Sequence, residues 1–368
     1  MANKAFKFRL YPSVLQEQLI IKTFGCCRFI YNKMLADRKS HYEQFHEALK
    51  NTPAQYKGEY QFLKEVDSLA LANEQMHLNT AFQNFFRTKG KVGYPKFKSK
   101  KCPKQTFTTN CVNGSIRVTD NKHIRLPKLG DIRIDGHRSI PEDYIIKSAT
   151  ISKNASGKYF ISILTEYTLE ISDIQLNPEN SIGLDYSSPD FYVDNQNRSP
   201  DGFKHLYRIS EPKLAKEQRK LSHMCPGSHN YQKQKAKVAK LHEHIANQRT
   251  DFIEKLSLSL SSTYDIVCLE DINLQNISQC LTLGKSTMDN GFGFFRTRLE
   301  QKMSAQGKVV VKIDKWFPSS KMCHHCGTIN SELNLSDREW DCACGKHILR
   351  DQNAAENIRT EGLRLLGF

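Results

Sequence analysis

Four cysteines near the C-terminal end form two close pairs, Cys323 with Cys326 and Cys342 with Cys344. Two such pairs separated by a short loop predict a tetrahedral zinc site. Because the protein fills all four coordination positions, we expect one structural zinc ion rather than a catalytic one. The second pair is spaced Cys-x-Cys, which is less usual than Cys-x-x-Cys. This leaves a nearby histidine as an alternative ligand: His324, His325 or His347.

Three acidic residues, far apart in the sequence, stand where predicted elements begin or end. Asp185 and Glu270 follow apolar strand patterns, and Asp351 opens a helical pattern directly after the cysteine region. A carboxylate at the end of a buried strand is costly unless it meets a metal ion or a cation. Together the three would hold two Mg²⁺ ions, the arrangement used for phosphodiester hydrolysis. Taken singly, each has the alternative of a turn or helix-cap residue, which for Asp351 is the start of a helix. Neighbouring acids are rivals: Asp190, Asp194 and Asp271.

The overall charge of the chain favours a polyanionic partner. The 368 residues carry a formal net charge of +15, and such an excess promotes salt-sensitive binding to nucleic acid. An ordinary basic enzyme is the alternative. The sequence shows neither a secretory signal nor an apolar run of 18 residues, so we expect a cytoplasmic protein with no membrane partner and with reduced thiols.

The first 175 residues predict a β-domain interrupted by helices. Residues 1–10 alternate as a strand does, and short alternating runs separated by turn residues return over 105–167. Between them, apolar residues recur at helical spacing over 13–34 and 69–86. We therefore expect a small antiparallel barrel or sheet that carries an inserted helical lobe.

The later part of the chain predicts an α/β module. Residues 181–194 have the pattern of strand, tight turn and strand. Helical patterns over 213–221 and 233–256 indicate a hairpin with basic outer faces. Strands follow at 263–270 and 308–314, with a helix around 294–305 between them and a last helix over 351–366.

Two basic regions are candidate nucleic-acid surfaces. Residues 87–104 hold eight basic residues and no acid, with aromatic residues between them, which suits a surface that tracks a phosphate backbone and stacks bases. The helical hairpin is the second region. For both, the alternative is a solvated basic surface. The candidate contacts are Tyr94, Lys96, Lys98, Lys100, Lys101, Lys233, Lys237 and Arg249.

Several stretches together resemble one protein family over nearly the whole chain. They are FKFRLYPS, FGCCRFIYN, GYPKFKSKK, GLDYSSPDFYVD, ANQRTDF, VCLEDINL, FPSSKMCHHCG, LSDREWDCACG and RDQNAAENI. In these the chain is similar to TnpB, the RNA-guided DNA nucleases encoded by insertion sequences and regarded as ancestral to type V CRISPR effectors.

The resemblance implies a multidomain α/β fold. An RNase H-like RuvC nuclease domain would comprise residues 177–318 and 346–368, with a zinc knuckle inserted at 319–345. A wedge β-barrel would comprise residues 1–12 and 99–176, and a helical recognition lobe residues 13–98. Asp185, Glu270 and Asp351 would be the magnesium-binding triad of a DNA endonuclease.

The resemblance also implies partners. These are a guide RNA from the transposon end and a double-stranded DNA target beside a short motif, with one chain per guide RNA favoured, in the prokaryotic cytosol or nucleoid. Gln75, Lys96 and Lys98 would contact the motif. Ile348 and Leu349 stand where the family commonly has His-Asp, but this departure and the Cys-x-Cys pair leave the triad intact. We therefore predict an active nuclease; the alternatives are a nuclease-inactive RNA-guided regulator and a transposase or its accessory protein.

Overall fold

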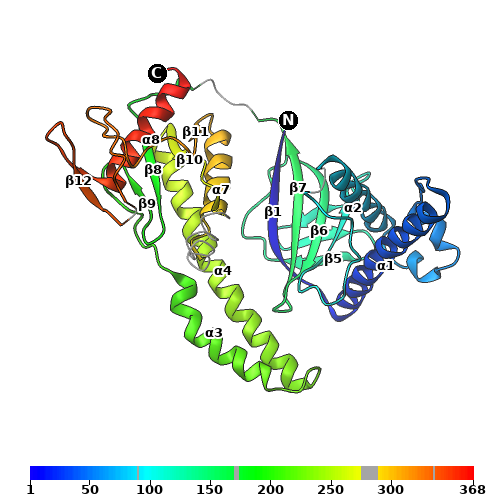
Figure 1. The fold of residues 1–368 in the computed structure, drawn as a ribbon. Coiled ribbons are helices and arrows are strands. Elements are labelled where there is room, and N and C mark those ends of the chain that lie inside the picture. The colour runs from blue at the N-terminus through cyan, green and yellow to red at the C-terminus, as the bar shows by residue number, and fades with distance from the viewer. Residues whose placement is uncertain (89–90, 170–173, 275–288, 335) are drawn as a thin grey trace. The chain divides into compact units, whose positions relative to one another are not determined.

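The computed structural model describes residues 1–88, 91–169, 174–274, 289–334 and 336–368. Its chain forms two compact units, Met1–Leu169 and Glu170–Phe368, drawn in Figure 1. Within the described ranges, no helix is both long enough and apolar enough to cross a membrane. Five predicted regions fall partly outside the described residues: the basic segment and the recognition lobe (both at 89–90), the wedge (170–173), the nuclease domain (275–288) and the knuckle (335).

Unit 1 contains a seven-stranded antiparallel sheet in the order β2-β6-β7-β1-β5-β4-β3. Its first strand lies in the middle, paired with β7 from Ala2 opposite Tyr167 to Leu10 opposite Tyr159. Phe6, Phe8 and Leu10 are buried, as the alternating pattern predicts. The strands are β1 (Ala2–Tyr11), β2 (Gln105–Asn110), β3 (Arg117–Asp120), β4 (His123–Leu126), β5 (Gly130–Ile134), β6 (Ile145–Lys153) and β7 (Tyr159–Tyr167).

Helices are inserted between the first and second strands of this sheet, as predicted. They are α1 (Val14–Phe45), two 3₁₀ turns, η1 (Pro53–Lys57) and η2 (Gln61–Lys64), and α2 (Ser68–Arg87). The predicted end of the first helix, at residue 34, is wrong by 11 residues. The turns beyond residue 34 have no apolar stripe that would predict them. They carry i,i+4 ion pairs instead, Lys33–Asp37 at 2.9 Å and Lys39–Glu43 at 3.8 Å.

Unit 2 contains a four-stranded sheet in the order β11-β10-β8-β9. The strands β8 (Ser181–Ser187), β10 (Ile266–Glu270) and β11 (Val309–Ile313) are parallel, and β9 (Phe191–Asp194) is antiparallel to β8. One face packs into a core with α4 (His229–Thr263) and α7 (Phe292–Ala305). The opposite face packs against α8 (Arg350–Leu366), as Figure 1 shows.

Two smaller elements complete unit 2. The helix α3 (Leu206–Ser222) forms an antiparallel hairpin with α4, and the Ser228 hydroxyl caps α4 by accepting a hydrogen bond from the Tyr231 amide at 3.1 Å. A separate two-stranded sheet, β12 (Glu339–Asp341) with β13 (His347–Leu349), precedes α8. This small sheet extends past residue 345, where the predicted knuckle ends.

Candidate active site and zinc-binding cluster

Asp185 and Glu270 lie on neighbouring parallel strands and on the same face of the sheet. In the register between β8 and β10, Leu184 pairs with Leu269, so Asp185 and Glu270 follow as the next residues of their strands. Paired residues of parallel strands point to one side, and the strands are about 4.8 Å apart. Asp185 is followed by two more residues of β8, so it does not end the strand as predicted.

Asp351 reaches this face from α8, where it stands in the first turn. The helix lies very close to the sheet at two glycines. A Cβ atom placed on Gly183 would be 1.9 Å from the Ala355 carbonyl oxygen, and one placed on Gly362 would be 2.3 Å from the Cys268 sulfur. These close contacts therefore set the distance between α8 and the sheet, and with it the position of Asp351 relative to the two strand acids.

The three carboxylates interact electrostatically. Desolvation raises the pKa of Asp185 well above its usual range, and the charges of Glu270 and Asp351 raise it further, while Arg350 opposes them. Burial also raises the pKa of Glu270. Carboxylates whose charges act on one another in this way favour a bound cation, and their oxygen atoms are the donors that Mg²⁺ prefers. The donor chemistry of the three acids thus fits a magnesium site.

Side chains that were not predicted hold two of these acids. The Ser319 hydroxyl hydrogen-bonds the Glu270 carboxylate and opposes the rise of its pKa. Arg350 Nε lies 3.1 Å from one Asp351 carboxylate oxygen, and Arg338 lies 3.4 Å from the other. Ser319 and Arg338 lie in loops and Arg350 is the first residue of α8, so no periodic pattern in the sequence marks them as partners of the acids.

The rival acids have other partners. Asp194 accepts hydrogen bonds from the backbone and from the Arg198 guanidinium, at 2.8 Å. Asp190 accepts the Ser187 hydroxyl at 3.0 Å, and Asp271 pairs with Arg296 at 3.4 Å.

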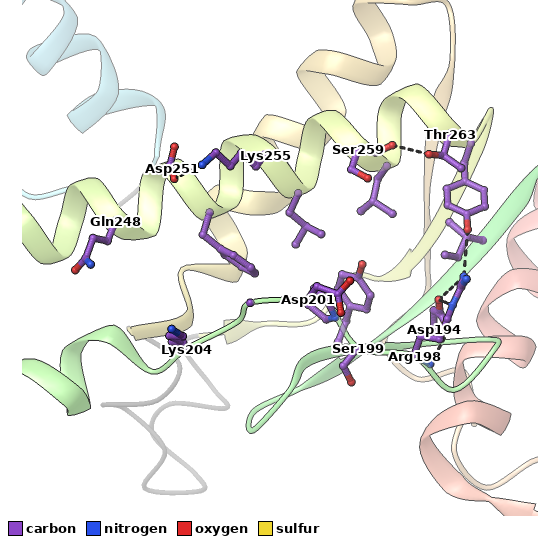
Figure 2. A pocket seen from close by; sticks show the side chains of 18 of the residues that line it. Asp194, Arg198, Ser199, Asp201, Lys204, Gln248, Asp251, Lys255, Ser259 and Thr263 are labelled. Atoms are coloured by element: carbon purple, nitrogen blue, oxygen red, sulfur yellow. Dashed lines mark hydrogen bonds and ion pairs between the residues drawn. The ribbon is translucent and has the colours of Figure 1, made fainter.

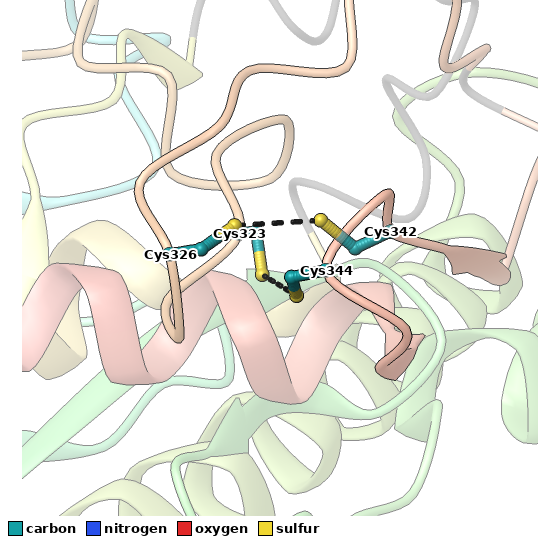
Figure 3. A group of neighbouring side chains, drawn as sticks. All are labelled: Cys323, Cys326, Cys342 and Cys344. Atoms are coloured by element: carbon teal, nitrogen blue, oxygen red, sulfur yellow. Dashed lines mark hydrogen bonds between the residues drawn. The ribbon is translucent and has the colours of Figure 1, made fainter.

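The four cysteines come together as the spacing predicts. Their sulfur atoms all lie within 4.8 Å of one another, the one such group of three or more metal-ligand side chains in the described ranges. Figure 3 shows the two close contacts, Cys326 to Cys342 at 3.5 Å and Cys323 to Cys344 at 3.9 Å. A tetrahedral zinc site with Zn–S bonds of about 2.3 Å places its sulfurs about 3.8 Å apart. The cluster therefore fits zinc.

Both members of the Cys-x-Cys pair belong to this cluster, and two of the alternative histidine ligands have other partners. His324 Nδ1 lies 3.1 Å from Asn353, and His347 Nδ1 lies 2.8 Å from Asp341. A glycine in the left-handed region follows each pair, Gly327 (φ 75°) and Gly345 (φ 83°). Their amides donate back to Cys323 and Cys342, which tightens each turn around its sulfurs.

Two buried asparagines of α8 connect the cysteine cluster to the acids. The Asn353 and Asn357 side-chain amides donate to the Met322 carbonyl at 2.7 and 2.6 Å, and both also bond the Ser319 carbonyl. The Asn353 side-chain oxygen accepts the His324 amide at 2.9 Å. The chain just before and within the first cysteine pair is thus bonded to the helix that carries Asp351.

The predicted nucleic-acid contacts fall into two groups. In unit 1, Lys96, Lys100 and Lys101 are exposed, Gln75 is half-buried and Tyr94 packs edge-on against Phe82 and Phe85. Lys98 is bonded to the buried Glu74.

In unit 2, Lys233 is exposed and Lys237 pairs with Glu217 at 3.0 Å. Arg249 pairs with the buried Asp289, also at 3.0 Å. Lys98, Lys237 and Arg249 are therefore each paired with an acid of the protein itself, which the sequence did not reveal.

A cavity of about 850 Å³ lies beside β9, between the segment that follows this strand and α4. Figure 2 shows its charged rim, which includes Arg198, Lys204 and Lys255. None of the three candidate catalytic acids lines it. The acid site is therefore separate from this hollow.

Comparison with known families matches three parts of the chain. Residues 1–47 match a family described as "Helix-turn-helix domain", residues 164–281 "Probable transposase", and residues 292–358 "Cas12f1-like, TNB domain". The first of these segments folds here as strand β1 and the single helix α1.

Two curated relatives match almost the whole chain, each named "Putative RNA-guided DNA endonuclease". The protein from Streptomyces pristinaespiralis is 34% identical over 98% of this chain and 90% of its own length. InsQ from Escherichia coli K12 is 29% identical over 99% of this chain and 93% of its own length. Among solved structures, a Cas12f1–sgRNA–target DNA complex is similar in fold, with a TM-score of 0.63 at 12% identity over 97% of this chain and 98% of that one.

Proposed function

The chain belongs to the TnpB family, and from this premise we propose that it is an RNA-guided DNA endonuclease. The observation that carries the proposal is the placement of Asp185, Glu270 and Asp351. Two of them lie on adjacent parallel strands and the third on the helix packed over the same face. This combination of residues suits the hydrolysis of phosphodiester bonds in DNA matched by the guide.

We assign the three carboxylates as ligands of two magnesium ions, which when bound would supply Lewis acidity and an activated water. The raised pKa values of Asp185 and Glu270 support this assignment, because a bound cation would offset the burial that raises both values and the repulsion from Glu270 and Asp351 that further raises the pKa of Asp185. Ser319 would orient Glu270 through its hydrogen bond. Arg338, which pairs with Asp351, is 63% exposed and so is available to an incoming phosphate.

The domain assignments follow from the same premise. The sheet of β8, β10 and β11 with antiparallel β9 and packed α8 would be an RNase H-like RuvC domain, and the four cysteines would be its structural zinc knuckle. The sheet of unit 1 would be the wedge β-barrel. The helices inserted after β1 would be the recognition lobe.

The proposed partners are a guide RNA from the transposon end and double-stranded DNA beside a short motif, with one chain bound per guide RNA. The net charge of +15 supports a polyanionic partner. Gln75 on α2, with Lys96 and Lys98 on the segment after it, would contact the motif. Lys98 would reach DNA only by loosening its bond to Glu74.

A cleavage assay on the chain with its co-purified RNA tests the function. Asp185→Ala or Glu270→Ala should abolish Mg²⁺-dependent cleavage of guide-matched DNA and leave guide-RNA binding nearly unchanged. Asp190→Ala is the matched control, because this exposed acid lies in the same hairpin and should retain cleavage. Unimpaired cutting by Asp185→Ala or Glu270→Ala would refute the site. RNA-guided DNA binding without cleavage by the unmodified chain would favour the nuclease-inactive regulator.

A further inference from the structure

Trp316 is unusually exposed for a tryptophan. The residue is 81% exposed, whereas the chain's other tryptophan, Trp340, packs against the cysteine cluster. Tryptophan is highly buried on average, although a single exposed apolar residue is by itself no evidence of a site. Whether Trp316 belongs to a binding site therefore depends on where it lies relative to the three acids.

The loop that carries Trp316 is held on both sides. The Trp316 amide donates to the Asp314 carboxylate at 2.7 Å, and the Phe317 amide donates to the Asp314 carbonyl at 3.1 Å. Phe317 packs into the core between the sheet and α8, and the Ser319 amide donates to the Phe317 carbonyl at 2.8 Å. The backbone under Trp316 is thus fixed, and the indole is left in solvent.

This loop leaves the sheet at the edge where the acids lie. Ile313, the last residue of β11, pairs with Glu270, and Ser319 bonds the Glu270 carboxylate. Three residue steps from Trp316 to Ser319 span at most about 11 Å between Cα atoms. A stacked strand covers that length in about three nucleotides at about 3.4 Å each. A strand whose phosphate reaches the acids would therefore have bases within reach of Trp316.

The surroundings of Trp316 carry the charge that a nucleic-acid strand needs. Lys315 Nζ lies 5.0 Å from the centre of the indole ring, and no ion pair to Lys315 is found in the described part of the chain. A free ammonium beside an exposed ring is the combination that binds a phosphate while a base stacks on the aromatic face.

We propose that Trp316 is a stacking platform for an unpaired base of the DNA strand that enters the acid site, with Lys315 contacting a neighbouring phosphate. The inference rests on the proposed nuclease function, because guide pairing with one DNA strand leaves the other strand unpaired. Stacking on one aromatic ring is sequence-tolerant, so Trp316 would position the strand without reading its bases.

The test uses the full chain loaded with guide RNA and two background substitutions. Asp185→Ala prevents cleavage, and Trp340→Phe leaves Trp316 as the sole tryptophan. Titration with single-stranded oligothymidylate unrelated to the guide should quench the Trp316 fluorescence as the oligonucleotide binds. In an anisotropy titration with a labelled oligonucleotide, Trp316→Ala should raise the Kd about tenfold, and Trp316→Phe should restore most of the affinity.

Phe294→Ala is the matched control, because Phe294 is an exposed ring on α7, which packs on the opposite face of the sheet. This variant should bind like its parent. Saturating DNA binding without quenching, or an unchanged Kd for Trp316→Ala, would overturn the proposal. Quenching by oligouridylate without quenching by oligothymidylate would also overturn the proposal. None of these measurements reads cleavage, so a chain without nuclease activity fails the earlier assay and not this one.

Discussion

Replacing Gly183 with alanine tests whether contact between α8 and the sheet sets the geometry of the acid site. The added Cβ would lie 1.9 Å from the Ala355 carbonyl oxygen and 2.9 Å from the Arg359 backbone nitrogen. Cβ contacts essentially never fall below 3.0 Å, so α8 must move away by at least about 1.1 Å. The obstruction is backbone, and a change of rotamer cannot relieve it.

This displacement should affect both stability and cleavage. Overpacking of this kind costs about 1–3 kcal/mol in the free energy of unfolding. Ala355 lies one turn after Asp351, so the same movement shifts the Asp351 carboxylate relative to Asp185 and Glu270. A misplacement of about 1 Å in a catalytic group lowers the rate about 100-fold.

The assays are urea unfolding of the full chain and single-turnover cleavage at saturating Mg²⁺ with guide RNA bound. Gly25→Ala is the matched control, because Gly25 lies inside α1 with no atom within 4 Å of the added Cβ. That change should stabilise the protein by about 0.5–1 kcal/mol and leave cleavage unchanged. If Gly183→Ala kept the parent's urea midpoint and rate, the close seating of α8 would be wrong.

Three further predictions concern the elements around the site. Replacing Cys323 and Cys326 together with serine should release zinc, loosen α8 and abolish cleavage; a zinc-free double variant with full activity would refute the positioning role of the cluster. Asn353→Ala removes buried hydrogen bonds to the knuckle backbone, so it should lower the free energy of unfolding in urea by about 3 kcal/mol and speed the release of zinc to a chelator. Thr360→Ala, an exposed change on the same helix, is its control. Equal zinc release by the two variants would contradict the proposed connection between Asn353 and the cysteine cluster. A side-chain amide and an ammonium group on α4 hydrogen-bond the Glu217 carboxylate and lower its pKa to about 2. The stabilising contribution of Glu217 is therefore present above pH 4.5 and is lost as the pH falls towards 2. The difference in urea midpoint between the parent and Glu217→Gln should therefore shrink over that range, and a constant difference would exclude this ion pair as its source.

Local patterns in the sequence were enough for most of the elements. Alternation along residues 1–10 predicted the first strand, and helical spacing over 69–86 predicted α2 within one residue at each end. The polar end of α1 escaped prediction because after Leu35 its side chains are exposed or half-buried and form ion pairs, so no apolar stripe continues there.

The sequence by itself determined the zinc cluster and named the three acids as candidates. Cysteine spacing limits which sulfurs can meet around one ion, and acids at strand ends are costly without a cation. Tertiary structure alone decided that Asp185 and Glu270 share one face and that Asn353 bonds the cysteine loop to α8. Strand register and the packing of a helix on a sheet bring together residues tens of positions apart, and no local pattern encodes such contacts.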